Sequence, residues 1–200
     1  VNACVLPVPG AGLMNGARRY GGGERAGDKP SYSMICYGFD TFTDASYAAW
    51  DVEKHFKRSL GRRLGLDPEF VRFIPAGMIQ HDRELWDIMV EVIADRGYEG
   101  RIGLQVDVAA GTYYDNDKGV FVGLFSAEDK SLEDLFALYH EMVEKYPFVI
   151  LEDPLDEDDF AGHARLTREL PIEIVGDDLF TTNPERVRKG IAMGAANAVL

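Results

Sequence analysis

Acidic residues follow buried-looking apolar runs at three points in this chain, and this pattern constrains the fold more than any other feature. The three acids are Asp107 after residues 102–106, Glu152 after residues 148–151 and Asp177 after residues 172–176. A short β-branched run bounded by turn residues predicts a buried strand. A helical stretch follows each of the last two runs, so the unit of strand, acid, loop and helix repeats. We therefore expect an α/β fold with parallel strands.

The three acids are also the first candidates for a binding site. In parallel α/β folds, ligands meet the C-terminal ends of the strands. Carboxylates from three successive strands would converge there on one hard cation such as Mg²⁺, which prefers oxygen ligands. For each acid taken alone, a capped turn or a salt bridge is the alternative. Together, Asp107, Glu152 and Asp177 are predicted metal ligands.

Size and charge narrow the possible classes of protein. A chain of 200 residues with 46% apolar and 28% charged residues is typical of one globular domain, with two as the alternative. The net charge of −13 disfavours non-specific binding to nucleic acid or to an anionic membrane. No apolar run approaches the length of a membrane span. We expect no nucleic-acid partner and no membrane partner.

The cysteines and the first residues indicate the compartment. Cys4 and Cys36 are the only cysteines and lack metal-type spacing, so we expect no disulfide framework and a reducing, cytoplasmic location. The start has neither the basic region nor the long apolar region of a signal peptide. It also lacks an initiator Met, for which processing or a longer parent chain would account.

Local patterns predict the order of elements along the chain. They are an extended segment over Val5–Pro9, a loop over 10–30, a strand over 33–37, helices over 43–64 (capped by Thr43) and 82–96, the strand before Asp107, a hairpin turn over 116–119, a helix from the Ser131 capping box to 145, the strand before Glu152, a helix over 159–170, the strand before Asp177, a helix capped by Asn183-Pro184 and ending at Gly194, and a strand beginning near 196. The strands are too few to close an eight-stranded barrel. A chain ending inside a buried strand leaves an open edge, which predicts truncation or assembly with another chain.

The loop over 10–30 is the most basic part of the chain. It contains Gly21-Gly22-Gly23 together with Arg18, Arg19, Arg25 and Lys29. It could be a mobile anion-binding lid or a disordered surface loop. The second interpretation is favoured, because a glycine-rich loop without a strand and a helix around it is a weak phosphate signal.

Several segments together resemble enolase, the phosphopyruvate hydratase of glycolysis. They are Asp107–Ala110, Glu141–Pro147, Glu152–Asp159, Gly176–Arg186 and Gly194–Ala198, with weaker matches at Leu6–Pro9, Met14–Gly16 and Met34–Ile35. The resemblance implies an incomplete enolase-type TIM barrel over residues 1–200. Residues 101–200 are its best-matching βα units, and residues 1–30 are an extended segment and the basic loop. The family's N-terminal capping domain and last barrel strands are expected to be absent from this sequence.

The resemblance also implies an activity. Asp107, Glu152 and Asp177 are placed where enolase has its three Mg²⁺ carboxylates. The implied reaction is the Mg²⁺-dependent dehydration of 2-phosphoglycerate to phosphoenolpyruvate, a carbon–oxygen lyase reaction in which the metal stabilises a dianionic intermediate. The implied partners are a small phosphorylated acid as substrate and further copies of the chain in a homo-oligomer.

Other catalytic positions of the family differ here. The stretches corresponding to its Ser-His-Ala and Gln-Glu segments are 17–20 and 31–35, which contain no His and no Glu, and 73–77 replaces its Asp-Glu-Gly-Gly segment. The family's basic Lys lies in the strand after Ala-Asn-Ala, and this sequence ends at Leu200 before it. Loss of a general base removes several orders of magnitude in rate. His81 or Lys29 could substitute, but their spacing gives no support, so catalytic and substrate-binding residues stay unassigned.

Three hypotheses follow. The first is an enolase-family enzyme of which this is a partial chain. The second is a non-catalytic enolase-like protein, a pseudoenzyme that keeps the fold and serves as a metal-binding or regulatory subunit. The third is a different reaction of the superfamily that uses the same metal and another base.

Overall fold

One six-stranded sheet organises the chain, whose computed structural model describes residues 6–69, 71 and 73–200. In spatial order its strands are β1 (Gly10–Met14), β2 (Ser31–Ile35), β3 (Gly103–Asp107), β6 (Phe148–Glu152), β7 (Glu173–Gly176) and β8 (Ala198–Val199). The helices are α1 (Phe42–Leu64), α2 (Arg83–Asp95), α3 (Leu132–Lys145), α4 (Phe160–Glu169) and α5 (Pro184–Met193). Two 3-10 turns, η1 (Glu24–Ala26) and η2 (Ala110–Tyr113), and a hairpin of β4 (Tyr114–Asp115) and β5 (Val120–Phe121) complete the list.

The strand directions confirm the predicted α/β architecture. β2 is antiparallel to both β1 and β3, whereas β3, β6, β7 and β8 are parallel to one another. From the second strand onwards, the predicted order of β, α, α followed by βα units with a hairpin insert is therefore correct, whereas the first strand was expected in the segment Val5–Pro9 and lies at Gly10–Met14. Over the described residues the sheet stays open, with β1 at one edge and β8 at the other.

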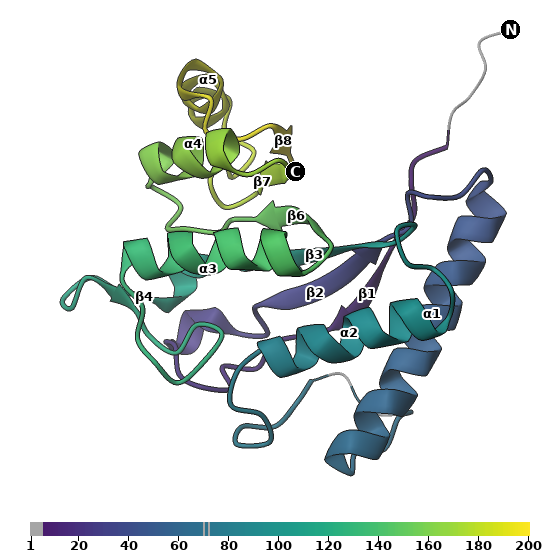
Figure 1. The fold of residues 1–200 in the computed structure, drawn as a ribbon. Helices are drawn as coiled ribbons and strands as arrows, with labels where there is room; N and C mark the ends of the chain where they lie inside the picture. Colours follow the sequence, from purple (N-terminus) through teal and green to yellow (C-terminus); the bar gives the residue numbers. More distant parts are fainter. Residues whose placement is uncertain (1–5, 70, 72) are drawn as a thin grey trace, which may run out of the picture.

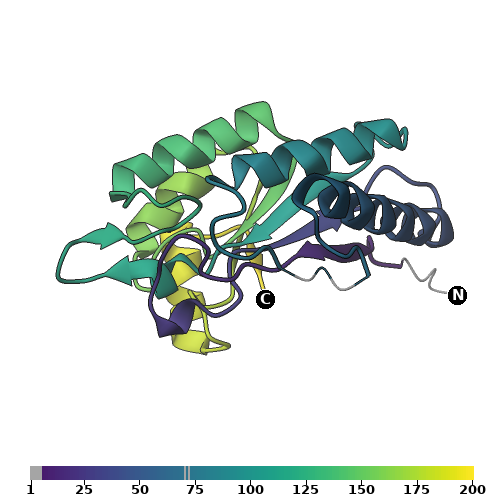
Figure 2. The same cartoon turned by 90° about the horizontal axis from the view of Figure 1, so that it is seen from below.

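Helices cover one face of this sheet, as Figures 1 and 2 show for α1, α2 and α3. The predicted core face of α1 is confirmed, since Ala45, Ala48, Ala49, Val52, Phe56 and Leu60 are buried. Trp86 on α2 is fully buried and packs edge-on against Phe125, Tyr146 and Phe148. This burial of apolar side chains fixes the strands whose ends form the site described below.

The predicted helix ends are mostly confirmed. Ser131 forms a full capping box with Asp134, Asn183 caps α5 with Pro184 at its first position, and Gly194 ends α5 in the left-handed region at φ +63°. The cap of α1 was predicted at Thr43 and is wrong: the Thr41 side chain accepts the Asp44 N–H at 3.1 Å. Both threonines satisfy the local preference for a cap, so only the backbone geometry distinguishes them.

The N-terminal part needs a second correction. Residues 10–14, predicted as loop, form β1, and the strand predicted over 33–37 spans 31–35 instead. Glycines made 10–14 look irregular, but pairing with β2, from Gly10 opposite Ile35 to Met14 opposite Tyr32, supplies the ladder of hydrogen bonds.

Two predictions fall partly on residues outside the described part, namely the start of the segment Val5–Pro9 and Cys4. Cys36 is buried and free, and burial raises the pKa of its thiol to about 11. Across the described residues, none of the helices has both the length and the apolar character needed to cross a membrane.

Candidate metal centre

The parallel strands bring acidic residues to one edge of the sheet. Asp107 ends β3 and lies in register beside Glu152, which ends β6. Glu152 is in turn paired with Val175 of β7, and Asp177 follows that strand directly after Gly176. Because these three strands run the same way, their C-terminal ends meet at the same edge.

The carboxylate oxygens form two adjoining groups that share Asp153. Asp107, Glu152 and Asp153 each offer an oxygen within 4.8 Å of the others, and so do Asp153, Asp177 and Asp178. The structure thus brings two of the three predicted ligands, Asp107 and Glu152, into one group. It places the third, Asp177, in the neighbouring group.

Asp153 links the two groups by holding the backbone after β7. Its buried carboxylate accepts the N–H groups of Asp177 at 3.2 Å, Asp178 at 2.8 Å and Leu179 at 3.1 Å. Asp153 is not among the residues predicted for the site, because nothing in an acidic run shows which carboxylate accepts hydrogen bonds from a distant part of the backbone. Asp153 therefore positions Asp177, since its own oxygens already have hydrogen-bond donors.

Burial raises the pKa of three acidic groups at this edge, Glu152, Asp153 and Asp178. Glu152 is only 5% exposed, and burial raises its pKa, while the nearby Lys29 ammonium opposes that rise. Gln105, two residues before the end of β3, donates from Nε2 to Glu152 Oε2 at 3.1 Å. Burial also raises the pKa of Asp153 to about 6 and, together with the charge of Asp177, raises that of Asp178. A cation at this edge would favour the ionised carboxylates.

Lys29 reaches the same edge from the basic loop. Because β2 is antiparallel to β3, Ser31 at the start of β2 pairs with Asp107 at the end of β3. Lys29 stands two residues before Ser31, and its ammonium contacts Asp107 Oδ2. The spacing of Lys29 in the sequence did not indicate that it lies near the site. The antiparallel pairing of β2 with β3 places it there.

Two further cations of the basic loop, Arg19 and Arg25, also pair with carboxylates. Arg19 is buried and forms an ion pair of 2.9 Å with the fully buried Asp82, which precedes α2. Burial opposes the charge on the guanidinium, but Asp82 together with Tyr32 and Tyr20 more than offsets this, so the pKa of Arg19 is raised. Arg25 contacts Glu157 at 3.2 Å. Three of the loop's four cations therefore contact carboxylates elsewhere in the fold.

Two of the divergent stretches meet at Asp82. Arg19 comes from 17–20 and Tyr32 from 31–35, and the Tyr32 hydroxyl donates to Asp82 Oδ2 at 2.6 Å. Tyr20 donates to the other oxygen at 2.9 Å. We call Arg19, Tyr20, Tyr32 and Asp82 the Asp82 network. In the third stretch, 73–77, Ile74 is fully buried.

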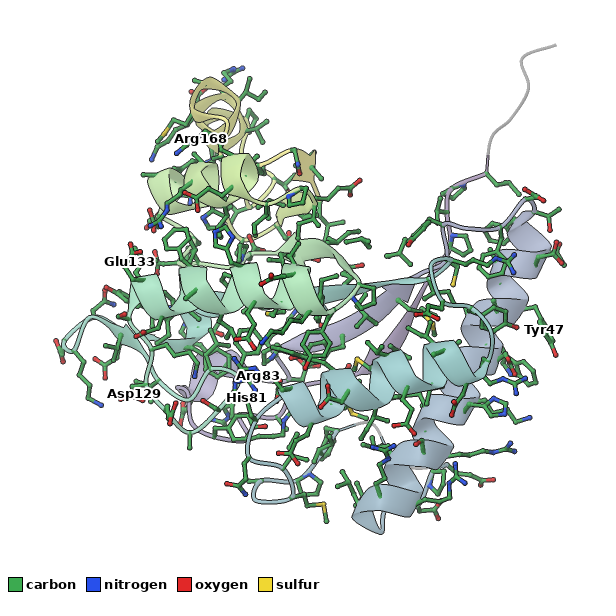
Figure 3. The ribbon with its side chains drawn as sticks, in the orientation of Figure 1. Tyr47, His81, Arg83, Asp129, Glu133 and Arg168 are labelled. Carbon is green, nitrogen blue, oxygen red and sulfur yellow. The ribbon has the colours of Figure 1, made fainter. Side chains whose placement is uncertain are left out.

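His81 lies beside this network, next to Arg83 at the start of α2 (Figure 3). The Arg83 N–H donates to His81 Nδ1 at 2.9 Å, and its guanidinium lies 2.9 Å from Nε2. Burial, followed by the Arg83 charge, lowers the pKa of His81 to about 4. A group with this pKa is a weak base at neutral pH.

The donor set at the strand ends fits a hard divalent cation. Every candidate ligand atom is a carboxylate oxygen, and Mg²⁺ takes oxygen ligands in an octahedron at about 2.0–2.1 Å. Asp107 and Glu152 come from neighbouring strands in register, so the sheet itself fixes their separation. These two residues, with Asp177 from the adjoining group, could hold such an ion.

Comparison with known proteins agrees with this architecture. A family model described as "Enolase, C-terminal TIM barrel domain" matches residues 3–200. The chain is 37% identical over 206 residues to an enolase of Corynebacterium kroppenstedtii, a match covering 100% of the chain and 46% of the relative. It is 36% identical over 204 residues to an enolase of Methanococcus maripaludis, with the same two shares. With an enolase of Methanopyrus kandleri the identity is 37% over 206 residues, covering 98% of the chain and 46% of the relative.

The chain therefore spans about half the length of the curated relatives that it matches. The match runs through the strands that carry Asp107, Glu152 and Asp177 and through the divergent loop before β2. On the family model and on these relatives, the chain belongs to the enolase family, as a form of its C-terminal TIM barrel domain.

Proposed function

We propose that the protein containing this chain is a carbon–oxygen lyase that dehydrates 2-phosphoglycerate to phosphoenolpyruvate with Mg²⁺, the glycolytic reaction of enolase. The observation that carries the proposal is the in-register pair of carboxylates, Asp107 and Glu152, at the C-terminal edge of parallel strands, with Asp177 one strand further. The relatives compared above are named enolase, which supports the same activity for this protein.

In this proposal Asp107, Glu152 and Asp177 hold the cation, and Asp153 and Gln105 position two of them. The bound ion would stabilise negative charge that develops on the substrate carboxylate. Gln105 orients Glu152 through its 3.1 Å hydrogen bond, and Asp153 fixes the backbone of Asp177. The group that removes the carbon-bound proton is not assigned to any residue of this chain.

The test is a turnover assay on the full-length protein. Formation of phosphoenolpyruvate from 2-phosphoglycerate is followed by ultraviolet absorption, in Mg²⁺ and after removal of Mg²⁺ with EDTA. We expect Mg²⁺-dependent turnover in the parent and its loss in Asp107→Asn, whose side chain has almost the same size but no charge. A matched control is Asp117→Asn in the exposed turn between β4 and β5. Turnover that survives both EDTA and Asp107→Asn would reject the proposal.

A second candidate function is supported by the Asp82 network. Two stretches at the family's divergent catalytic positions place Arg19 and Tyr32 on a fully buried carboxylate, where neither side chain meets solvent. This favours a non-catalytic protein that retains the fold and binds the metal in a regulatory role. A calorimetric Mg²⁺ titration beside the turnover assay separates the two functions, because this candidate requires Mg²⁺ binding without turnover.

We further propose that the protein is a cytoplasmic homo-oligomer without a nucleic-acid partner. The net charge of −13 supports the last point, since phosphate backbones repel an acidic surface. Light scattering coupled to size-exclusion chromatography tests the oligomeric state, and we expect a mass at least twice that of one chain.

A further inference from the structure

The backbone of Lys29 is held by three separate segments. Its N–H donates to the Ala26 carbonyl of η1 at 3.0 Å, and its carbonyl accepts the Tyr113 hydroxyl of η2. Gly16 packs so closely on that carbonyl that a Cβ at Gly16 would collide with it. The place from which the lysine side chain starts is therefore fixed by contacts that do not involve its own charge.

The side chain that starts there enters the acidic edge. The ammonium contacts Asp107 Oδ2, and the two side chains are 31% and 17% exposed. The Lys29 charge also acts on the nearby Glu152 and Asp178 carboxyls, so several negative charges face one positive charge. The oxygen that Lys29 contacts belongs to a residue that could also hold a divalent cation.

We propose that Lys29 is a built-in counter-cation of this carboxylate group, and that its ammonium competes with the divalent cation for Asp107 and so sets the affinity of the site. This inference rests on the proposed function, because it deepens the role of the same carboxylates. In the metal-free protein Lys29 neutralises part of the acidic charge. When the divalent ion takes Asp107 Oδ2, the ammonium withdraws from that oxygen.

The experiment is a calorimetric Mg²⁺ titration of the full-length parent, Lys29→Met, Lys29→Arg and Arg25→Met. The Met variant keeps the length of the side chain and the three backbone contacts but removes the charge. An opposite charge in contact shifts a carboxylate equilibrium by about 10-fold or more, so we expect Mg²⁺ to bind Lys29→Met roughly tenfold more tightly than the parent. Lys29→Arg should stay close to the parent.

Arg25→Met is the matched control for long-range charge. Arg25 lies on the same loop and pairs with Glu157, and its side chain is 73% exposed. Its removal changes the net charge by the same amount without touching Asp107, so we expect less than about a twofold change in affinity, since solvent screens exposed charges. A change as large as that of Lys29→Met would overturn the competition and leave only a general field effect.

Melting curves provide a second readout that does not depend on activity. In EDTA, Lys29→Met should melt below the parent, and added Mg²⁺ should raise its melting temperature by more than it raises that of the parent. Circular dichroism confirms that the variants fold.

The outcomes separate this inference from the proposed function. Equal Mg²⁺ affinities of the parent and Lys29→Met overturn the competition but leave the metal site intact. Binding that is seen only in Lys29→Met supports the competition strongly. Failure of every variant to bind Mg²⁺ overturns the competition together with the magnesium site of the proposed function.

Discussion

Asp82→Asn tests the Asp82 network most directly. Asn keeps the shape of Asp but removes the charge that faces Arg19, whose side chain is 2% exposed. At 2.9 Å and an effective dielectric constant of about 20, the attraction of two unit charges is about 6 kcal/mol. Desolvation offsets part of it, and breaking one side of a buried pair typically costs about 3–5 kcal/mol. We expect the free energy of unfolding, measured by urea titration, to fall by about that amount.

Two controls define what would refute this reasoning. Glu185→Gln breaks an exposed pair with Arg188 on α5 and should cost less than about 1 kcal/mol. The double variant Arg19→Met with Asp82→Asn should lose less than the sum of the two single changes, because no unpaired charge remains buried. A loss below about 1 kcal/mol for Asp82→Asn alone would mean that the ion pair does not hold the loop against α2.

Three further predictions concern pH, metal binding and capping. The pKa of His81 is about 4 in the folded chain and about 6.5 in the unfolded chain. Between pH 6.5 and 4, His81 is therefore protonated in the unfolded state but neutral in the folded state. The free energy of unfolding should therefore fall by roughly 2–3 kcal/mol as the pH falls from 6.5 to 4, and this fall should be missing in His81→Gln. Urea titrations that give parallel pH profiles for the parent and the variant would contradict this prediction. Mg²⁺ should stabilise the parent by about 2.7 kcal/mol at a hundredfold excess over Kd, and Asp177→Ala should abolish the rise in melting temperature that reports this stabilisation. An undiminished rise would remove Asp177 from the site. Ser131→Ala removes the capping box of α3 and should cost about 1 kcal/mol in urea unfolding, whereas an unchanged midpoint would show that solvent replaces the cap.

The order of elements and the acidic strand ends could be predicted from the sequence because both are local. Each apolar run marks a strand, and the residue after a parallel strand must lie at its C-terminal edge, whatever the rest of the chain does. Asp107 and Glu152 were placed correctly at one edge for this reason. Capping signals such as that of Ser131 were also readable, because cap and helix lie within a few residues of each other.

Long-range features could not be predicted in the same way. Arg19 looked like a surface residue because its partner, Asp82, lies 63 residues away in the chain. β1 was missed because Gly10 and Gly12 have poor strand propensity, and only pairing with β2 makes them a strand. Lys29 at Asp107 follows from the antiparallel direction of β2, which no local periodicity encodes.

Because β2 is antiparallel to β1, the connection from Asn15 to Pro30 (the excursion) can change without a change in the rest of the sheet. β1 ends and β2 begins at the same rim, so the chain departs from and returns to neighbouring positions. Loop-closure entropy grows slowly with length, so an insertion into this excursion that keeps the Arg19–Asp82 pair should leave the register of the sheet intact. Substitutions in this one connection can therefore change the side chains that lie beside the acidic edge of the sheet, while the carboxylates at the ends of the parallel strands keep their positions.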